Sequence, residues 1–346
     1  MDKCRSRAML LRADEVGSVI DRRAFTCLLA AGLFVAPLAV RAQTPTKMRR
    51  LGVLAPSAPF PLGYEAPLRD LGWIEGKNIV VERRFTNFKY ELLPGAAEEL
   101  VRLKVELIIT GGTEATLAAK NATTSIPIVM GSSAEPVGMG IVASLARPGG
   151  NITGYSIVGT ELAAQWAALV HELLPGAQRI ALIVERTRPV VQLLRRQSEA
   201  AYRSLGVTPV VIEGTGGMKE FRDVLEEAGR LGVQAMDLLG WEAPVEDVPA
   251  IIATTMRYRL PVIISGGVEG RALLEAGGLM SLTNDVDDQG RRVAAMIDKI
   301  LRGTKPADIP IEQPTRFRLS VNLKAAKALG IAVPQSLLLR ADELIQ

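Results

Sequence analysis

Cysteine and histidine, which supply most thiolate, zinc-binding and acid–base chemistry, are nearly missing from this chain. Its 346 residues include two cysteines, Cys4 and Cys27, and one histidine, His171. A structural zinc site uses four Cys or His ligands, and these few residues cannot supply one at any plausible spacing. Both cysteines lie near the N-terminus, so the long remainder of the chain has no disulfide. We expect no metal site.

The motifs of common enzyme classes are also missing. No Gly-x-Ser-x-Gly nucleophile motif and no Gly-x-x-x-x-Gly-Lys-Ser/Thr phosphate loop occurs, and His171 lies within an ordinary helical pattern. The segment 138–143 has the glycine spacing of a dinucleotide loop, but it begins seven residues after its strand, whereas that loop must follow the strand at once. We therefore expect no catalytic residues and no cofactor.

Outside the N-terminal segment, basic and acidic residues are nearly equal in number. Seven of the 41 basic residues and four of the 37 acidic residues lie within residues 1–42, so the rest is close to neutral. The sequence pI of about 9.1 thus gives little support to a nucleic-acid partner, and we expect none.

One long apolar run does occur, within "DRRAFTCLLAAGLFVAPLAVRAQ" at residues 21–43. Its 17 apolar residues, 24–40, are short for a membrane span, which needs about 20. Arg22 and Arg23 precede the run as in a twin-arginine export signal, and small residues follow it. We interpret residues 1–42 as a signal peptide cleaved near Ala42, which predicts a periplasmic protein. An uncleaved anchor is the alternative.

Short apolar runs alternate with helical patterns from Arg50 onward. Runs rich in valine and isoleucine predict strands at 50–55, 78–85, 105–110, 126–131, 179–185, 207–213, 233–239 and 260–265. Helical spacing predicts helices at 91–103, 113–123, 160–174, 189–205, 218–231 and 245–258. Two successive series of this kind indicate an α/β protein with two doubly wound parallel-sheet lobes.

Three segments rich in Gly and Pro separate these series. They are residues 146–159, 275–285 and 302–314. Three such breaks predict that the chain crosses between two lobes three times, which makes a three-stranded hinge.

The candidate ligand residues lie in loops after predicted strands, because open parallel sheets bind ligands at the carboxyl ends of their strands. Thr113 either caps a helix or donates to a ligand. The full set is Ser57, Thr113, Ser133 and Glu135 in the first series, Arg186, Trp241 and Ser265 in the second, and Asp285 near a crossing. Trp241 stands out as a possible stacking surface because only 4% of the chain is aromatic.

Two long segments of the sequence resemble a known family. "LVRLKVELIITGGTEATLAAKNATTSIPIVMGSSAEPVGMGIVASLARPGGNITG" and the tail from "GGLMSLTND" to the end are similar to ABC-transporter substrate-binding proteins related to the tryptophan/tyrosine-type binding proteins. The resemblance implies a type I periplasmic-binding fold that traps ligand between two lobes. It assigns residues 49–155 plus 280–303 to lobe 1 and 156–279 plus 304–346 to lobe 2.

The departures from the family pattern fall in the expected ligand loops. Glu135 stands where Asp is common, Arg186-Thr187 replaces Asn-Pro, residues 282–285 replace Tyr-Gly-x-Asn, and the loop 55–73 is shorter. The scaffold is therefore expected to be kept, but the ligand need not be an aromatic amino acid.

The resemblance implies a monomeric, exported solute-binding protein that passes a small polar ligand, amino-acid-like or another small organic solute, to a membrane ABC permease. Arg186 would pair a ligand carboxylate, Glu135 or Asp285 an ammonium, and hinge closure would exclude water. An alternative is a periplasmic sensor that presents its bound form to a membrane receptor kinase. An exported α/β enzyme is a third reading, which lacks a base, a metal set and a cofactor loop.

Overall fold

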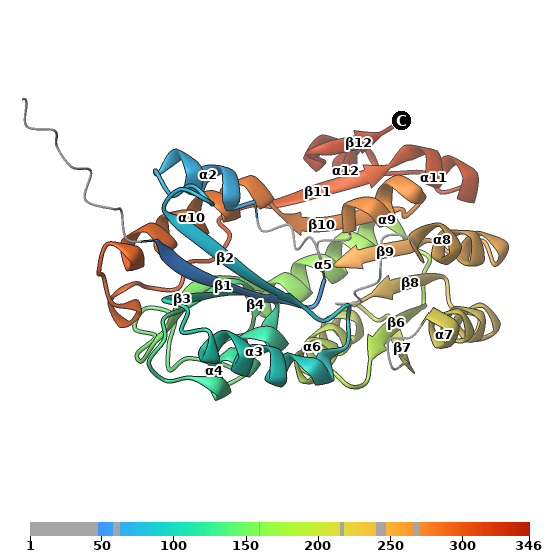
Figure 1. The fold of residues 1–346 in the computed structure, drawn as a ribbon. Coiled ribbons are helices and arrows are strands. Elements are labelled where there is room, and N and C mark those ends of the chain that lie inside the picture. The colour runs from blue at the N-terminus through green and yellow to red at the C-terminus, as the bar shows by residue number, and fades with distance from the viewer. Residues whose placement is uncertain (1–47, 58–62, 159, 215–217, 240–246, 266–269) are drawn as a thin grey trace, which may run out of the picture. The chain divides into compact units, whose positions relative to one another are not determined.

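The structure is a computed structural model that describes residues 48–57, 63–158, 160–214, 218–239, 247–265 and 270–346 (Figure 1). Residues from Met48 to the C-terminus form one compact unit. The expected signal peptide, residues 1–42, lies outside the described residues. Within the described part of the chain, no helix is both long and apolar enough to cross a bilayer.

The first sheet has five strands, all parallel, in the order β2-β1-β3-β4-β5. The strands are β1 (Arg49–Ala55), β2 (Ile79–Phe85), β3 (Leu107–Gly111), β4 (Ile128–Ala134) and β5 (Ile152–Val158). Every residue of β3 and β4 is buried, which is why neither strand contains a charged residue or alternates apolar with exposed polar residues.

Helices cover both faces of this sheet. On one face Leu54 packs among side chains of α3 (Leu93–Arg102) and α4 (Thr113–Ala122). On the other face Leu51 and Val53 pack with helix α10 (Val286–Leu301) and with the short α2 (Glu65–Asp70). The first lobe is therefore a three-layer unit completed by a helix from late in the sequence.

The second sheet has seven strands in the order β12-β11-β10-β9-β8-β6-β7. They are β6 (Arg179–Glu185), β7 (Thr208–Gly214), β8 (Ala235–Leu238), β9 (Val262–Ser265), β10 (Met280–Asn284), β11 (Phe317–Asn322) and β12 (Glu343–Ile345). Strands β6 to β10 are parallel, β11 is antiparallel to β10, and β12 is parallel to β11. Figure 1 shows β10, β11 and β12 side by side.

Its two faces are again covered by helices. Side chains of α5 (Thr160–Leu173) and α6 (Pro189–Ser204) pack on one face with those of α11 (Leu323–Leu329) and α12 (Gln335–Arg340). The opposite face carries α7 (Met218–Arg230), α8 (Val248–Arg257) and α9 (Gly270–Ala276). The expected α/β class with two doubly wound, mainly parallel lobes is confirmed.

The chain passes between the lobes three times, and each passage falls in or beside a segment expected from its Gly and Pro content. The passages lie at β5–α5, at β10–α10 and before β11. The boundaries differ in detail from the expected division. Strand β10 pairs with β9 and β11 of the second sheet, whereas α10 and Ile309 pack on the first. The late boundary is displaced because strand β10 buries its residues in the second sheet before the chain crosses.

Candidate functional site

Both sheets reverse their strand order beside the first strand of each series. The order β2-β1-β3 in the first sheet repeats as β7-β6-β8 in the second. In open α/β sheets, ligands bind outside the carboxyl ends of the strands at such a reversal. The loops after β1, β3 and β6 are therefore the first places to look for a site.

The turn from β3 into α4 depends on a glycine. Gly112 has φ of 89° and ψ of 160°, a conformation that side chains other than glycine rarely adopt. Gly112 is the N-cap of α4, so no side chain caps this helix. Thr113 is thus the first residue of the helix, and the expectation that it caps the helix is wrong because the chain turns one residue earlier.

The hydroxyls at the ends of β3 and β4 bond to one another. Thr113 Oγ1 accepts the Ala134 backbone N–H at 2.9 Å and lies 3.4 Å from the donating Ser133 hydroxyl. Thr113 is 3% exposed and Ser133 is fully buried. Burial without a partner would cost each hydroxyl about 1–3 kcal/mol, so these contacts fix the two loops against each other. They hold the edge of the first sheet in one shape.

Glu135 follows β4 in a strained backbone conformation, with φ of 49°. Among the described residues, five that are not glycine have positive φ, and three of these, Asn87, Phe88 and Glu135, follow the carboxyl ends of β2 and β4. Strain of this kind concentrates at binding sites. The Glu135 carboxylate accepts a hydrogen bond from Gln197 Nε2 of helix α6 at 3.1 Å.

A buried ion pair joins the two lobes. Arg188, after β6, donates from Nε and from Nη2 to the two carboxylate oxygens of Glu114 in the first turn of α4, each at 3.1 Å. The Arg188 side chain is 5% exposed and that of Glu114 is 11% exposed. The guanidinium also lies 4.8 Å from the ring centre of Tyr90, in the 3₁₀ turn Tyr90–Leu92. A two-pronged pair stacked on an aromatic ring is a strong and directional contact.

Proline places this arginine. Arg188 is the N-cap of α6 and is extended, with φ of −100° and ψ of 113°, because Pro189 follows it. Pro189 also begins α6, where its missing N–H costs nothing. Arg186, the cation that the sequence singled out, is instead exposed, and its backbone N–H donates to Gly214. Its role toward a ligand stays a prediction.

The other expected site residues lie as follows. Ser57 is half-buried just beyond β1, and Ser265 is the last residue of β9. Trp241 lies outside the described residues. Asp285 caps α10 by accepting the Asp288 backbone N–H at 3.0 Å and lies 3.8 Å from Arg318. The Asp288 N–H is the main reason, ahead of Arg318, that the pKa of Asp285 lies below its ordinary value.

The structure therefore brings Thr113, Ser133 and Glu135 together at the edge of the first sheet, and it adds partners that the sequence analysis missed. These are Arg188, Glu114, Tyr90 and Gln197. A local signal existed for two of them, since Glu114 directly follows the candidate Thr113 and Arg188 lies two residues after the candidate Arg186. The assembled groups can hold small polar molecules through hydroxyls and paired charges.

Comparison with known proteins identifies the family of this chain. A family model described as ABC transporter substrate binding protein matches residues 62–345. A curated relative, the tyrosine-binding protein of Clostridioides difficile strain R20291, is 26% identical over 276 residues, which cover 78% of this chain and 76% of the relative.

Solved structures show the same fold. An ABC domain from Streptococcus pneumonia in complex with L-Trp is 24% identical, covers 86% of this chain and 100% of its own, and has a TM-score of 0.78. A conserved domain protein from Vibrio cholerae has 22% identity, the same coverage and a TM-score of 0.79. A leucine-binding protein from Thermotoga maritima, 16% identical with a TM-score of 0.53, covers 75% of this chain and 77% of its own. The fold is that of the type I periplasmic binding proteins.

Proposed function

This chain belongs to the family of ABC transporter substrate-binding proteins, and on that premise we propose that it captures a small polar ligand between its two lobes and delivers it to an ABC importer. Proteins of this family bind small molecules and work with ABC permeases. The observation that carries the proposal is the set of contacts between the ends of the two sheets. Loops after β2, β3 and β4 contact the loop after β6 and helix α6.

The mechanism we propose is closure about the three crossings. Ligand binds first at one lobe, and closure then adds contacts from the other and excludes water. The fixed hydroxyl cluster of the first lobe supports a role as the preformed half. The contacts of Arg188 and Gln197 support the second lobe as the half that closes on it.

The ligand contacts remain the eight proposed residues, and the structure helps to rank them. Thr113 and Ser133 already use their hydroxyls within the first lobe, whereas Ser57 and Glu135 follow the carboxyl ends of β1 and β4. Arg186 would meet a ligand carboxylate, and Glu135 or Asp285 an ammonium. Trp241 and Ser265 complete the set. An amino acid satisfies this pattern of charges.

The first test is a thermal-shift screen of the purified protein. It starts from L-tyrosine and L-tryptophan, because the relatives carry these ligands in their names, and continues through other amino acids, purines, sugars and short peptides. Ligand at 100 times its Kd adds about 2.7 kcal/mol of stability, a shift of several degrees. Trp241→Ala and Glu135→Ala should weaken the hit, and Glu98→Ala, on an exposed helix face, should not. If both site variants keep full affinity, the proposed site is wrong.

We further propose export to the periplasm with cleavage near Ala42, a monomeric state and a membrane permease as partner. The family description, which names an ABC transporter, supports the permease over a receptor kinase. N-terminal sequencing of the protein from the periplasmic fraction should begin near Gln43. Retention of Met1 in that fraction would contradict the cleavage. Arg22→Lys with Arg23→Lys should block export if the twin-arginine route is used.

A further inference from the structure

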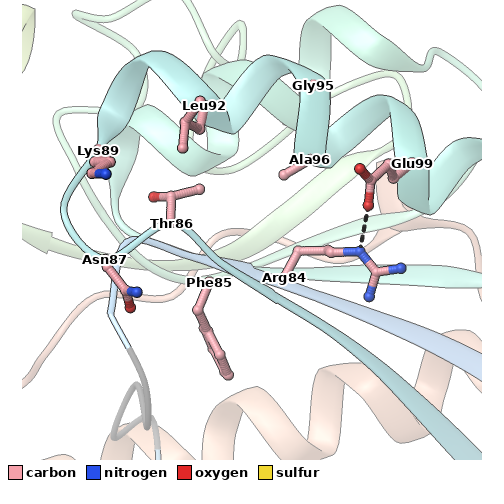
Figure 2. Close-up of a pocket in the computed structure, with 9 residues that line it drawn as sticks. All are labelled: Arg84, Phe85, Thr86, Asn87, Lys89, Leu92, Gly95, Ala96 and Glu99. Carbon is pink, nitrogen blue, oxygen red and sulfur yellow. Dashed lines mark hydrogen bonds and ion pairs between the residues drawn. The ribbon is translucent and has the colours of Figure 1, made fainter.

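A surface cavity of about 430 Å³ lies in the first lobe between the end of β2 and helix α3. All its lining residues fall between Arg84 and Glu99, so it is separate from the loops after β1, β3 and β4. Its volume falls within the range of small-molecule sites. Figure 2 shows Leu92 and Ala96 of the helical side facing Thr86 on the strand side, while Phe85 points away.

The base of this cavity carries a polar atom that the protein leaves unpaired. Thr86 is 6% exposed, and its hydroxyl is buried with no hydrogen-bond partner within the described residues. Its backbone N–H is satisfied by Ala55, so only the side chain lacks a partner. A buried hydroxyl without a partner is costly and uncommon. The Thr86 hydroxyl can therefore donate a hydrogen bond to a molecule bound in the cavity.

The two ends of the cavity differ in charge. At one end Arg84 Nε donates to the Glu99 carboxylate at 2.7 Å, which neutralises both groups (Figure 2). At the other end Lys89 is exposed and makes no ion pair within the described part of the chain. Helix α3 begins at Leu93, one residue after a lining residue, so the positive end of its dipole lies at the cavity. The charged residues that line the cavity, Arg84, Lys89 and Glu99, together carry a net positive charge.

The backbone between these groups is held in a strained form. Asn87 and Phe88 have φ of 50° and 61°, and the turn is fixed by hydrogen bonds from Phe88 to Pro56 and from Lys89 to Thr86. This geometry carries the chain from Thr86 at the base of the cavity to Lys89 at its edge. Thr86 and Lys89 are therefore three residues apart in the chain and both line the cavity.

We propose that this cavity binds a short aliphatic carboxylate as an accessory ligand of the first lobe. The carboxylate accepts hydrogen bonds from the Thr86 hydroxyl and the Lys89 ammonium, and the alkyl chain packs on Leu92 and Ala96. The site goes beyond transport of the main ligand, because none of the residues proposed for that ligand lines it.

The test uses saturation-transfer NMR with butyrate as the probe and butyramide, its uncharged analogue, as the matched control molecule. Butyrate should give a signal, and its affinity should exceed that of butyramide about tenfold, because hydrogen bonds to a charged acceptor are the stronger ones. Lys89→Gln should remove most of this preference. Lys77→Gln, an exposed lysine at the opposite end of β2, should leave it unchanged.

Thr86→Val separates binding from folding. It should weaken butyrate binding about fivefold. The same variant should unfold at an equal or higher denaturant concentration, because an unpaired buried hydroxyl has been replaced by a methyl group. A failure of the variant to fold would itself contradict the unpaired state of the hydroxyl.

Three results would overturn the proposal. They are no saturation transfer from butyrate, equal affinity for butyramide, and unchanged butyrate binding in both Lys89→Gln and Thr86→Val. None of these bears on the main ligand, because the thermal-shift screen above uses other residues and other molecules. The two proposals therefore fail independently.

Discussion

The ends of the two sheets share one strand order and treat their polar groups in opposite ways. At the first sheet, Thr113 and Ser133 bond to each other and to the backbone of β4, all within one lobe. At the second sheet, Arg188 reaches across to Glu114 of the other lobe. The Thr113–Ser133 contact satisfies itself within one lobe, which makes the first edge the self-satisfied edge, whereas the Arg188–Glu114 pair joins one lobe to the other.

This difference indicates a division of labour. A self-satisfied edge keeps its shape in any arrangement of the lobes, so it can serve as a preformed surface. A charge pair that crosses the boundary links its electrostatic energy to the distance between the lobes, because the attraction between two charges falls as they separate. The proposed closure therefore depends on the second edge more than on the first.

Removing the carboxylate that crosses the boundary should have the largest effect. Glu114→Ala leaves the Arg188 guanidinium buried without this partner and should lower the free energy of unfolding by about 3 kcal/mol. Urea unfolding followed by circular dichroism measures it, with Glu98→Ala, whose side chain is 64% exposed, as the matched control. Glu114→Leu combined with Arg188→Leu should recover most of the loss, and an equally unstable double variant would contradict the ion-pair argument.

The self-satisfied edge should respond next. Thr113→Val keeps the shape of the side chain but leaves the Ala134 N–H and the Ser133 hydroxyl without their acceptor, which should cost about 2 kcal/mol. Thr304→Val, at an exposed threonine, provides the control in the same unfolding experiment. Equal midpoints for the two variants would show that the hydroxyl cluster does not stabilise the first lobe.

Asp285 lies at the crossing between β10 and α10, and its contribution to the free energy of unfolding should depend on pH. Asp285→Ala removes the cap of α10 and should cost about 1 kcal/mol at pH 7. Because the folded state lowers the pKa of Asp285 below its ordinary value near 3.8, the charged form stabilises the fold. That contribution is complete above about pH 5 and is lost as the pH falls through the lowered pKa. A difference between wild type and variant that stays constant from pH 7 to pH 3 would contradict this account.

The smallest change in the free energy of unfolding is expected for the hydrogen bond between Gln197 and Glu135, the second contact between the lobes. Gln197→Met removes the donor to Glu135 and should cost about 0.5 kcal/mol, the lower end of the range for a partly exposed hydrogen bond. A double-mutant cycle with Glu135→Ala isolates the pair, since each single variant removes the same bond. A coupling free energy of zero would leave Arg188 as the contact that matters.

Strands β1 to β4 and β6 to β9 could be predicted because parallel sheets bury both faces of their inner strands, which leaves local apolar runs, whereas β5, β10, β11 and β12 were not predicted. Strand β5 was missed because "ITGYSIV" follows a Gly- and Pro-rich segment and contains Gly154. That glycine is required by the neighbouring strand, since a Cβ there would lie 2.3 Å from the Met130 carbonyl oxygen. Such close contact between distant segments leaves no local pattern in the sequence.

The candidate site was predicted at the level of loops and missed in part at the level of side chains. Arg186 was the candidate taken from the loop after the strand predicted at 179–185, and Arg188 of the same loop was not selected. Arg186 and Arg188 are the same residue type in the same loop, so residue type alone does not show which of them contacts the other lobe. The one local feature that distinguishes Arg188 is Pro189, which begins α6 and makes Arg188 its N-cap. The acceptor Glu114 lies 74 residues earlier in the chain, so no local pattern indicates the pair.

The placement of α10 sets an order of events during synthesis. Its side chains Met296 and Ile297 are completely buried against Leu51 and Val53 at the other end of the chain. A ribosome that has made residues 48–158 has therefore produced all five strands of the first sheet, with one face covered by the short α2 but not yet by α10. That face stays incompletely covered until helix α10 emerges, about 130 residues later, after most of the second sheet. The first lobe to be translated is thus completed late, which keeps the chain incompletely folded while most of it is being synthesised.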